Sequence, residues 1–366
     1  MPPDGTLPFF RHAILTHPAR MTTRINSVPE GASVDRTSTT TMRAVLSRDG
    51  TPTLATVPVP VPGPGEVLLE VSSAGMNRSD RLHVDGRYRQ RAFDHLERPD
   101  IPGSEVFGRV VEVHAAVNDV AVGEWAAALT GRAHAEYVAV DARLLLPVLP
   151  GIAHADLGAL PMALLTEFDA MVGLGGLRRG HRVVVTGATS GVGLLGLTLA
   201  RALGAEAVIA TSRSPESDSL LRQHGATEIA HDPEELSALG RRTGFDVVVD
   251  HVGGPVLEAA VEGLREGATS ISVGRLGGRS ATIDLVSLSS RRARLIGTTW
   301  KTRSMDEFAA ATQQVRAEVL PLVQDGEITA PVAHRIAFPE IDQAYELLAT
   351  ERRPGKILVE MGPAPA

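Results

Sequence analysis

Short apolar runs separated by turn residues fill the chain from residue 42 to about residue 150. They combine β-branched residues with Gly, Pro and Asp at their ends, as strands do; the runs are EVLLEVSSAG, FGRVVEVH and AEYVAV. The stretch VPVPVPGPGE carries too many prolines for a central strand, because proline donates no ladder hydrogen bond. The pattern predicts an irregular β-barrel over residues 42–163.

A different rhythm begins near residue 164, where strand-like and helical patterns alternate. The strand-like runs are RVVVTG, AVIATS, FDVVVDHVG, GATSISVG and ARLIGTTW, and the helical segments include GVGLLGLTLARALGA and ESDSLLRQHGA. Alternation of this kind builds right-handed βαβ units and a doubly wound parallel sheet. We therefore predict an α/β protein with a Rossmann domain over residues 164–330. The late strand KILVEM is expected to return residues 331–366 to the barrel.

Residues 1–41 lack this patterning. The segment SVPEGASVDRTSTTT is polar and has no periodic apolar positions, which predicts a disordered extension. The first 20 residues have no sustained apolar core with a cleavage site and make a poor signal peptide. A partner-binding or lid segment is the alternative interpretation of this extension.

Composition narrows the function classes. The net charge of −7, without a long basic run, argues against nucleic acid as a partner. No apolar run approaches the ~18 residues of a membrane span, so we expect no membrane association. The chain has no cysteine, which excludes disulfides, thiolate metal sites and a cysteine nucleophile. These features are compatible with the cytoplasm, where we expect the protein to act.

The segment TGATSGVGLLG contains the pattern G-x-G-x-x-G at Gly191, Gly193 and Gly196. A predicted strand at 183–186 precedes it and a predicted helix follows, which is the context that a dinucleotide-binding turn requires. Glycines without Cβ let the backbone approach a pyrophosphate, and the helix N-terminus offers it free N–H groups. The alternative is an ordinary glycine turn.

The expected cofactor is NADPH. An NAD site usually places an acidic residue ~20 residues after the turn, where it binds the ribose 2′-hydroxyl. Here that stretch reads Ala-Thr-Ser-Arg-Ser, with Ser212 and Arg213 at the critical positions and no acid. A guanidinium binds a 2′-phosphate bidentately, whereas a carboxylate repels it. The alternative for Arg213 is a solvated surface charge.

Residues 42–361 resemble the zinc-free quinone oxidoreductase branch of the medium-chain dehydrogenase/reductase superfamily. The resemblance rests on blocks in a fixed order, among them MRAV, PGPGEVLLEVSSAGMNRSD, GRY, IPGSEVFGRVVEV, HAEYVAV, LLTEFDAM, VVVTGATSGVGLLGLTLARALGA, FDVVVDHVGG, LIGTTWKTRS and RRPGKILVEM. It implies a GroES-like catalytic barrel interrupted by a Rossmann domain, with the active site between them. It also implies a homodimer, paired through the edge strand ARLIGTTW.

The resemblance implies that no metal is bound. Zinc-dependent relatives carry Cys and His at the positions matching Asn77 and Ser104, beside an acid matching Glu105. Zinc needs three or four N, S or O ligands in near-tetrahedral array, and Glu105 alone cannot supply them. The zinc-free branch instead transfers hydride from NADPH to a conjugated acceptor: a quinone, an enone or an enoyl thioester. A specialised-metabolite intermediate whose reduction triggers ring closure is one such acceptor.

Two residues are candidates for catalysis by this resemblance. Tyr88 matches a tyrosine that can donate a hydrogen bond or a proton to the carbonyl; simple packing at a loop end is the alternative. Asn77 is expected to orient the substrate or the nicotinamide ribose, and the alternative is a turn-forming Asn. Residues 89–101 form an unusually charged insertion beside this site, either a lid or a solvated loop.

The cofactor is expected to contact residues in several loops. The resemblance assigns Thr166 to the nicotinamide, Ser190 and Val192 with Gly191 and Gly193 to the pyrophosphate, and Ser212, Arg213 and His231 to the 2′-phosphate region. It places Val252 and Gly253 over the cofactor path, with Gly274 and Arg275 near the carboxamide. Lys356 either approaches the cleft or lies on the surface before an edge strand. A non-catalytic NADPH-binding or redox-sensing protein is the alternative function, and a zinc-dependent alcohol dehydrogenase is a third.

Overall fold

The structure is a computed structural model that describes residues 40–94, 98–148, 154–350 and 354–361. All described residues belong to one compact unit. Most of the predicted extension 1–41, residues 1–39, lies outside the described residues. The first strand, β1, begins at Thr41.

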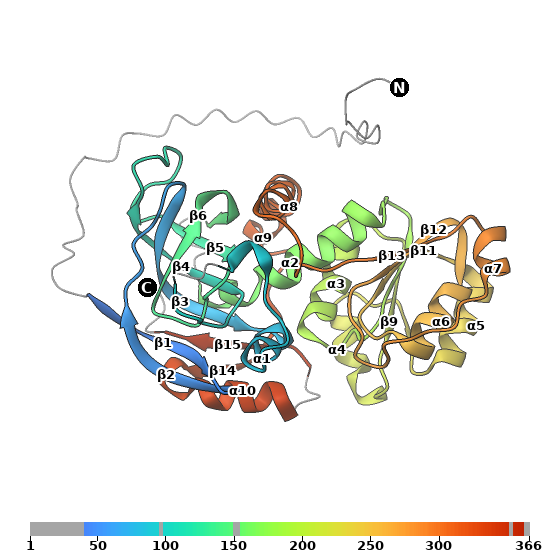
Figure 1. Cartoon of the computed structure of the whole chain (residues 1–366). Coiled ribbons are helices and arrows are strands. Elements are labelled where there is room, and N and C mark those ends of the chain that lie inside the picture. Colours follow the sequence, from blue (N-terminus) through green and yellow to red (C-terminus); the bar gives the residue numbers. More distant parts are fainter. Residues whose placement is uncertain (1–39, 95–97, 149–153, 351–353, 362–366) are drawn as a thin grey trace, which may run out of the picture. The chain divides into compact units, whose positions relative to one another are not determined.

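The barrel half is built on a seven-stranded sheet with the order β14-β15-β3-β4-β5-β7, in which β6 also pairs with β3 (Figure 1). A separate antiparallel pair, β1 and β2, completes this half. The strands are β1 Thr41–Arg48, β2 Thr51–Pro58, β3 Glu66–Met76, β4 Glu105–Val113, β5 Trp125–Leu129, β6 Tyr137–Asp141, β7 Leu145–Val148, β14 Val332–Ala337 and β15 Lys356–Glu360.

The Rossmann half is a six-stranded parallel sheet with the order β10-β9-β8-β11-β12-β13. Its strand order reverses between β8 and β11, which creates the crevice where α/β sheets bind ligands. The strands are β8 Arg182–Val185, β9 Ala207–Thr211, β10 Glu228–Ala230, β11 Phe245–Asp250, β12 Leu264–Ser272 and β13 Arg294–Gly297.

Helices cover both faces of this sheet, with α3 and α4 on one side and α5, α6 and α7 on the other (Figure 1). Successive side chains of β8 show why: Val183 and Val185 pack into one core, and Val184 packs into a second core across the sheet. Strands buried on both faces read as continuous apolar runs, as RVVV does. The doubly wound parallel sheet that the alternating pattern predicts is therefore confirmed.

The helices of the chain are mostly short. The α-helices are α1 Arg78–Val84, α2 Pro161–Phe168, α3 Gly191–Ala202, α4 Asp218–Gln223, α5 Pro233–Thr243, α6 Gly254–Glu262, α7 Leu285–Ser290, α8 Met305–Glu318, α9 Leu320–Gln324 and α10 Ile341–Thr350. The 3₁₀ turns are η1 Arg91–Phe93, η2 Ala142–Leu144, η3 Ala155–Ala159, η5 Pro215–Ser217 and η6 Phe338–Glu340, and η4 Asp169–Leu174 is a π-helical turn after α2. Among the described helices, none is long and apolar enough to cross a membrane.

The last strand ties the two halves together. β15 pairs antiparallel with β3 and parallel with β14, so KILVEM does return to the barrel sheet. Just before it, Gly355 N–H donates to the Thr189 carbonyl at 3.1 Å, and Gly355 forms an isolated bridge with Ser190. The start of β15 is therefore held against the glycine-rich turn.

Candidate active site

The glycine-rich turn follows β8 and leads directly into α3. Its left-handed residue is Gly187, with φ of 60°, and not one of the three motif glycines. Ser190 begins the helix, and its hydroxyl accepts a hydrogen bond from Gly193 N–H at 3.0 Å. A Cβ on Gly193 would lie 2.7 Å from the Ala188 Cα, so only glycine fits this close approach. The turn thus leaves an open cradle at a helix N-terminus, which suits an anion such as a pyrophosphate.

The other two motif glycines make room for side chains from elsewhere. A Cβ on Gly191 would lie 2.5 Å from the Lys356 Cδ. A Cβ on Gly196 would lie 2.6 Å from the Glu167 carboxylate oxygen Oε2, so Gly196 lets α3 pack on α2. The motif glycines therefore shape the turn, and two of them also leave space for the charged side chains of Lys356 and Glu167.

The predicted 2′-phosphate residues gather at the end of β9. Ser212 is buried, and its backbone carbonyl contacts the His231 ring Nδ1 at 2.8 Å. Arg213 is exposed and has no ion-pair partner among the described residues. The carbonyl of Thr211 in β9 accepts the Ala188 N–H at 3.1 Å, which joins this corner to the glycine-rich turn.

A buried polar network lies where the end of β3 pairs with the start of β15. The strand register pairs Met76 with Ile357, so Asn77 and Lys356 are the next residues out. The Lys356 ammonium donates to Asn77 Oδ1 at 2.6 Å and also to the Glu105 carboxylate. Asn77 Nδ2 donates to Glu105 Oε1 at 2.7 Å. Lys356 is 4% exposed and Glu105 is fully buried, so the interpretation of Lys356 as a surface lysine is wrong.

Local structure makes this burial possible. A Cβ on Gly75 would lie 2.7 Å from the Glu105 carboxyl carbon, so the glycine opens the space that the carboxylate fills. The second oxygen of Glu105 accepts the Met162 N–H at 2.8 Å, at the start of α2. A buried carboxylate is tolerated only when it is paired and hydrogen-bonded in this way.

This donor set does not fit zinc. By resemblance, Asn77 and Ser104 match the Cys and His of zinc-dependent relatives, beside an acid that matches Glu105. Here Asn77 and Glu105 both accept hydrogen bonds from the Lys356 ammonium. An ammonium and a dication compete for the same oxygens. In the described part of the chain, no group of three His, Asp or Glu residues lies close enough to hold a metal ion.

Asp80 extends the network toward α1. Its carboxylate accepts the Asn77 N–H at 2.7 Å and the Ser104 hydroxyl at 2.8 Å. Burial raises the pKa of Asp80 to about 7, against the opposing effect of these two hydrogen bonds, and the charge of Glu105 raises it further. Asp80 therefore has a pKa near neutrality and is hydrogen-bonded to the Asn77 backbone.

Tyr88 lies beyond α1, half-buried, and bonds across to the Rossmann half. Burial raises the pKa of Tyr88 to about 12, and the charge of Asp80 adds to this, while a hydrogen bond from Thr299 acts in the opposite direction. The tyrosine is therefore neutral at physiological pH. The Lys301 ammonium lies 5.9 Å from the centre of the ring.

Thr166 and its neighbour connect α2 to the Rossmann sheet. The Thr166 hydroxyl accepts a hydrogen bond from the Trp300 indole at 3.0 Å. The adjacent Glu167 carboxylate contacts the His251 ring Nε2 at 2.6 Å, and both side chains are buried. Burial lowers the pKa of His251, but the charge and hydrogen bond of Glu167 and the charge of Asp250 outweigh it, so the pKa is raised.

The loops after β11 and β12 bring the remaining predicted residues together. Gly253 has φ of 72°, and its N–H donates to the Asp250 carboxylate at 3.0 Å. Val252 N–H donates to the same carboxylate at 3.1 Å. A Cβ on Gly274 would lie 2.5 Å from the His251 carbonyl oxygen. Arg275, the next residue, is exposed.

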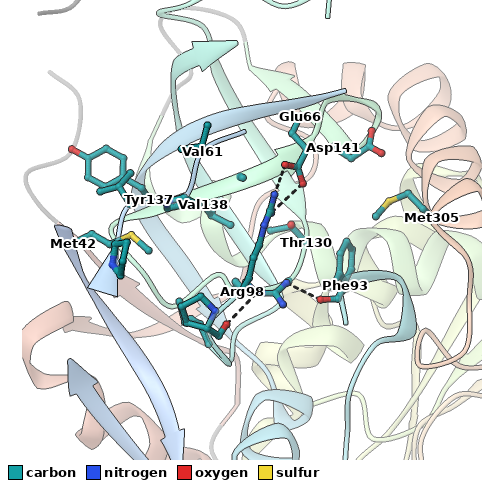
Figure 2. A pocket seen from close by; sticks show the side chains of 18 residues that line it. Met42, Val61, Glu66, Phe93, Arg98, Thr130, Tyr137, Val138, Asp141 and Met305 are labelled. Atoms are coloured by element: carbon teal, nitrogen blue, oxygen red, sulfur yellow. Dashed lines mark hydrogen bonds and ion pairs between the residues drawn. The ribbon is translucent and has the colours of Figure 1, made fainter. Parts of the chain in front are cut away.

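The charged insertion 89–101 packs on the barrel, and its residues 95–97 lie outside the described residues. It forms one wall of a cavity of about 260 Å³ that Phe93, Arg98 and Ile101 help to line. Figure 2 shows the Arg98 guanidinium reaching Glu66, with a shortest distance of 2.6 Å. None of the predicted catalytic or cofactor residues lines this cavity.

The sequence motifs do not predict three sets of contacts. These are the contacts of Lys356 with Asn77 and Glu105, the Glu167–His251 pair, and the contacts that Thr299 and Lys301 each make with Tyr88. Each joins segments far apart in sequence, as with Lys356 and Asn77, which are 279 positions apart. One feature of the sequence could have indicated the Glu167–His251 pair: both residues are titratable, and they are adjacent in sequence to the predicted cofactor residues Thr166 and Val252.

Comparisons with known proteins agree with this fold. Residues 63–151 match the alcohol dehydrogenase GroES-like domain, and residues 191–317 match the domain described as zinc-binding dehydrogenase. The chain is similar to the acryloyl-coenzyme A reductase of Sulfurisphaera tokodaii, with 25% identity over 84% of this chain and 96% of that protein. It is similar in structure to the quinone oxidoreductase of Thermus thermophilus, solved also with NADPH, with a TM-score of 0.72, 29% identity and coverage of 87% and 100%.

A further relative is much longer than this chain. The spectinabilin polyketide synthase system protein NorB of Streptomyces orinoci is 29% identical over 92% of this chain. The matched region spans only 15% of that protein's length.

Proposed function

We propose, from the premise that this chain belongs to the zinc-free quinone oxidoreductase-like branch of the medium-chain dehydrogenase/reductase superfamily, that it is an NADPH-dependent reductase of conjugated acceptors. The chain is an oxidoreductase of this superfamily, and a nicotinamide cofactor fits its Rossmann turn. The observation that carries the proposal is the Lys356–Asn77–Glu105 network. It puts a buried ammonium beside the glycine-rich turn, bound to residues that by resemblance match the metal site of zinc-dependent relatives.

Residues of this chain suit a phosphorylated dinucleotide. Ser190, Gly191 and Gly193 would hold the pyrophosphate at the α3 N-terminus, where a Cβ on Gly193 would clash with Ala188 and distort the turn. Arg213 would bind the 2′-phosphate, because it is exposed and without a carboxylate partner in the described residues. Thr166, held by Trp300, would face the nicotinamide.

The reaction follows from what a bound nicotinamide supplies, namely a hydride. A new C–H bond forms at the β-carbon of the acceptor, the C=C electrons shift toward the carbonyl, and negative charge develops on its oxygen. Tyr88 is neutral and keeps its hydroxyl hydrogen, so it can donate to that oxygen and then supply a proton. Lys356 fixes Asn77 and keeps the charge of Glu105 compensated, which lets Asn77 orient the ligand.

The acceptor class is a small conjugated carbonyl compound: a quinone, an enone or an enoyl thioester. An intermediate that cyclises after reduction falls within this class. We also propose a cytoplasmic homodimer that pairs through β13, which is an edge strand of the sheet and leaves Leu295 40% exposed.

The test is NADPH oxidation, followed by its absorbance, with a panel of simple quinones, enones and enoyl thioesters. Parent enzyme should turn over at least one of these classes, and Tyr88→Phe should lower kcat by about 10²-fold with little change in the NADPH dissociation constant. Tight NADPH binding without turnover of any acceptor would favour the alternative of a non-catalytic NADPH-binding or redox-sensing protein.

A further inference from the structure

The cavity in Figure 2 lies between the charged insertion and the barrel, and we call it the insertion cavity. Its volume of about 260 Å³ exceeds the ~150 Å³ of an engineered apolar cavity that binds benzene. Apolar side chains from β1, the loop after β2, the insertion, β6 and α8 line it, among them Met42, Val59, Phe93, Ile101, Ala139 and Met305. The insertion cavity therefore has room for about one substituted ring in an apolar setting.

The charged groups in its wall are already bonded within the protein. The Arg98 guanidinium donates to both Glu66 carboxylate oxygens, at 3.1 and 2.6 Å. Arg132 donates to two backbone carbonyl oxygens, at 2.7 and 3.2 Å, and Asp141 pairs with Arg143 at 2.8 Å. A charged ligand would have to compete with these bonds and lose its own hydration. The wall therefore favours a neutral molecule.

Thr130 supplies one polar group that points to a ligand. It follows β5, lines the cavity and is only 2% exposed. Figure 2 shows its hydroxyl among the side chains of the wall, and no partner bonds to this hydroxyl in the described part of the chain. A buried hydroxyl without a partner costs free energy, which a ligand with one hydroxyl or carbonyl group would recover.

We propose that the insertion cavity is a second binding site, separate from the hydride-transfer site, for a neutral molecule of about one substituted ring that carries a single hydroxyl or carbonyl group. The body of the ligand packs against Met42, Phe93 and Ile101, and its polar group bonds to the Thr130 hydroxyl. This site goes beyond the proposed function and does not depend on the reductase reaction.

An aromatic cluster leads from the cavity wall toward the cofactor residues. The ring of Phe93 lies 5.0 Å from that of Phe308, which lies 4.9 Å from the ring of Trp300, as measured between ring centroids. The Trp300 indole in turn donates to the Thr166 hydroxyl. A ligand that packs on Phe93 is therefore two ring contacts from Trp300, and its binding should change the fluorescence of Trp300.

The probe is 4-propylphenol, titrated into the full chain by calorimetry with no acceptor present. It should bind saturably at one site per chain. Thr130→Val should weaken its binding by about 3- to 10-fold and should leave the binding of propylbenzene, which has no polar group, unchanged. The charged analogue 4-propylbenzoate should bind at least about 10-fold more weakly than the phenol.

Ala139→Phe tests the location by filling the cavity. Ala139 lies on the same face of β6 as Tyr137, which packs against the core of Met42 and Ile101. The variant should abolish binding of 4-propylphenol and its effect on Trp300 fluorescence, measured in a Trp125→Phe background. Ala139→Leu, a smaller change, should weaken binding if the phenylalanine variant does not fold. Ala317→Phe, at an exposed position on α8, is the matched control and should bind the probe as the parent does.

Three results would overturn the proposal. The first is an absence of saturable binding, or binding that both Ala139 variants leave unchanged. The second is an equal loss for 4-propylphenol and propylbenzene in Thr130→Val, which contradicts the hydroxyl contact. The third is a loss in Tyr88→Phe without a loss in the Ala139 variants, which would place the probe at the hydride-transfer site. Failure of the protein to reduce any acceptor would contradict the proposed function and leave this binding result intact.

Discussion

Lys356→Met removes the buried ammonium while keeping a side chain of similar length. The change leaves the Glu105 carboxylate, which is fully buried, without its charge partner. Asn77 also loses the donor that holds its Oδ1 at 2.6 Å. Solvent cannot compensate either group, because Lys356 itself is only 4% exposed.

The expected cost is large on the scale of protein stability. Removing one partner of a buried ion pair costs about 3–5 kcal/mol, because the remaining charge stays buried and unpaired. The free energy of unfolding of a native protein is typically about 5–15 kcal/mol in total. Lys356→Met should therefore lose a substantial part of the stability of the chain, and the barrel sheet at β3 and β15 should open first.

The assay is equilibrium unfolding in urea, followed by the fluorescence of Trp125 and Trp300. The second variant is the double substitution Lys356→Met with Glu105→Gln, which removes both charges. Replacing a whole buried pair is often close to neutral, so the double variant should recover most of the loss. In it, the Asn77 amide can turn to accept a hydrogen bond from Gln at position 105.

A loss below about 1 kcal/mol in Lys356→Met would refute this reasoning, because it would mean that the ammonium does not compensate Glu105. A double variant as unstable as the single one would equally refute it, since the cost would then come from packing and not from an unpaired charge.

Three further predictions concern the cofactor corner and the buried titratable groups. Arg213→Ala should weaken NADPH binding by about 1.5–3 kcal/mol and leave NADH binding unchanged; equal losses for both cofactors, measured by fluorescence titration, would contradict the 2′-phosphate assignment. Burial raises the pKa of Asp80 to about 7 from its ordinary 3.8, so its contribution to stability is complete below about pH 4 and is lost as pH rises through about 7. Asp80→Asn imitates the protonated carboxyl, and its stability advantage over the parent in urea unfolding should widen by about 2–3 kcal/mol between about pH 5 and pH 8, whereas a constant difference would disprove the shift. The raised pKa of His251 gives a second test of the same sign: its contribution is complete below its ordinary 6.5 and is lost as pH rises through the raised value. Glu167→Gln should therefore destabilise the chain by about 3–5 kcal/mol at about pH 6 and by progressively less as pH rises; a pH-independent loss would show that His251 carries no charge in the pair.

The sequence predicts the fold well because the signals are local. The run RVVV is buried on both faces, and it is indeed β8 at the centre of the parallel sheet. The helix after the glycine-rich turn ends just before Gly204, which has φ of 86°, a conformation that favours glycine. The strand KILVEM joins β3 as predicted.

The site is less accessible to prediction because its contacts are not local. The motif glycines look like parts of a phosphate turn, yet Gly191 also makes room for Lys356 and Gly196 for Glu167. These contacts depend on how β15 and α2 pack against α3, and no spacing in the sequence reports that packing. In the sequence alone, Lys356 looks like a surface residue before an edge strand. Only the pairing of Ile357 with Met76 shows that Lys356 lies next to Asn77.

The most direct test of the account is a single turnover with NADPH carrying deuterium at both C4 positions and a simple enone or enoyl thioester, before and after treatment with a strong chelator. The account predicts deuterium at the β-carbon of the product, a proton from solvent at the α-carbon, and the same rate after chelation. Loss of activity on chelation with recovery on adding zinc, or the absence of deuterium from the β-carbon, would contradict it.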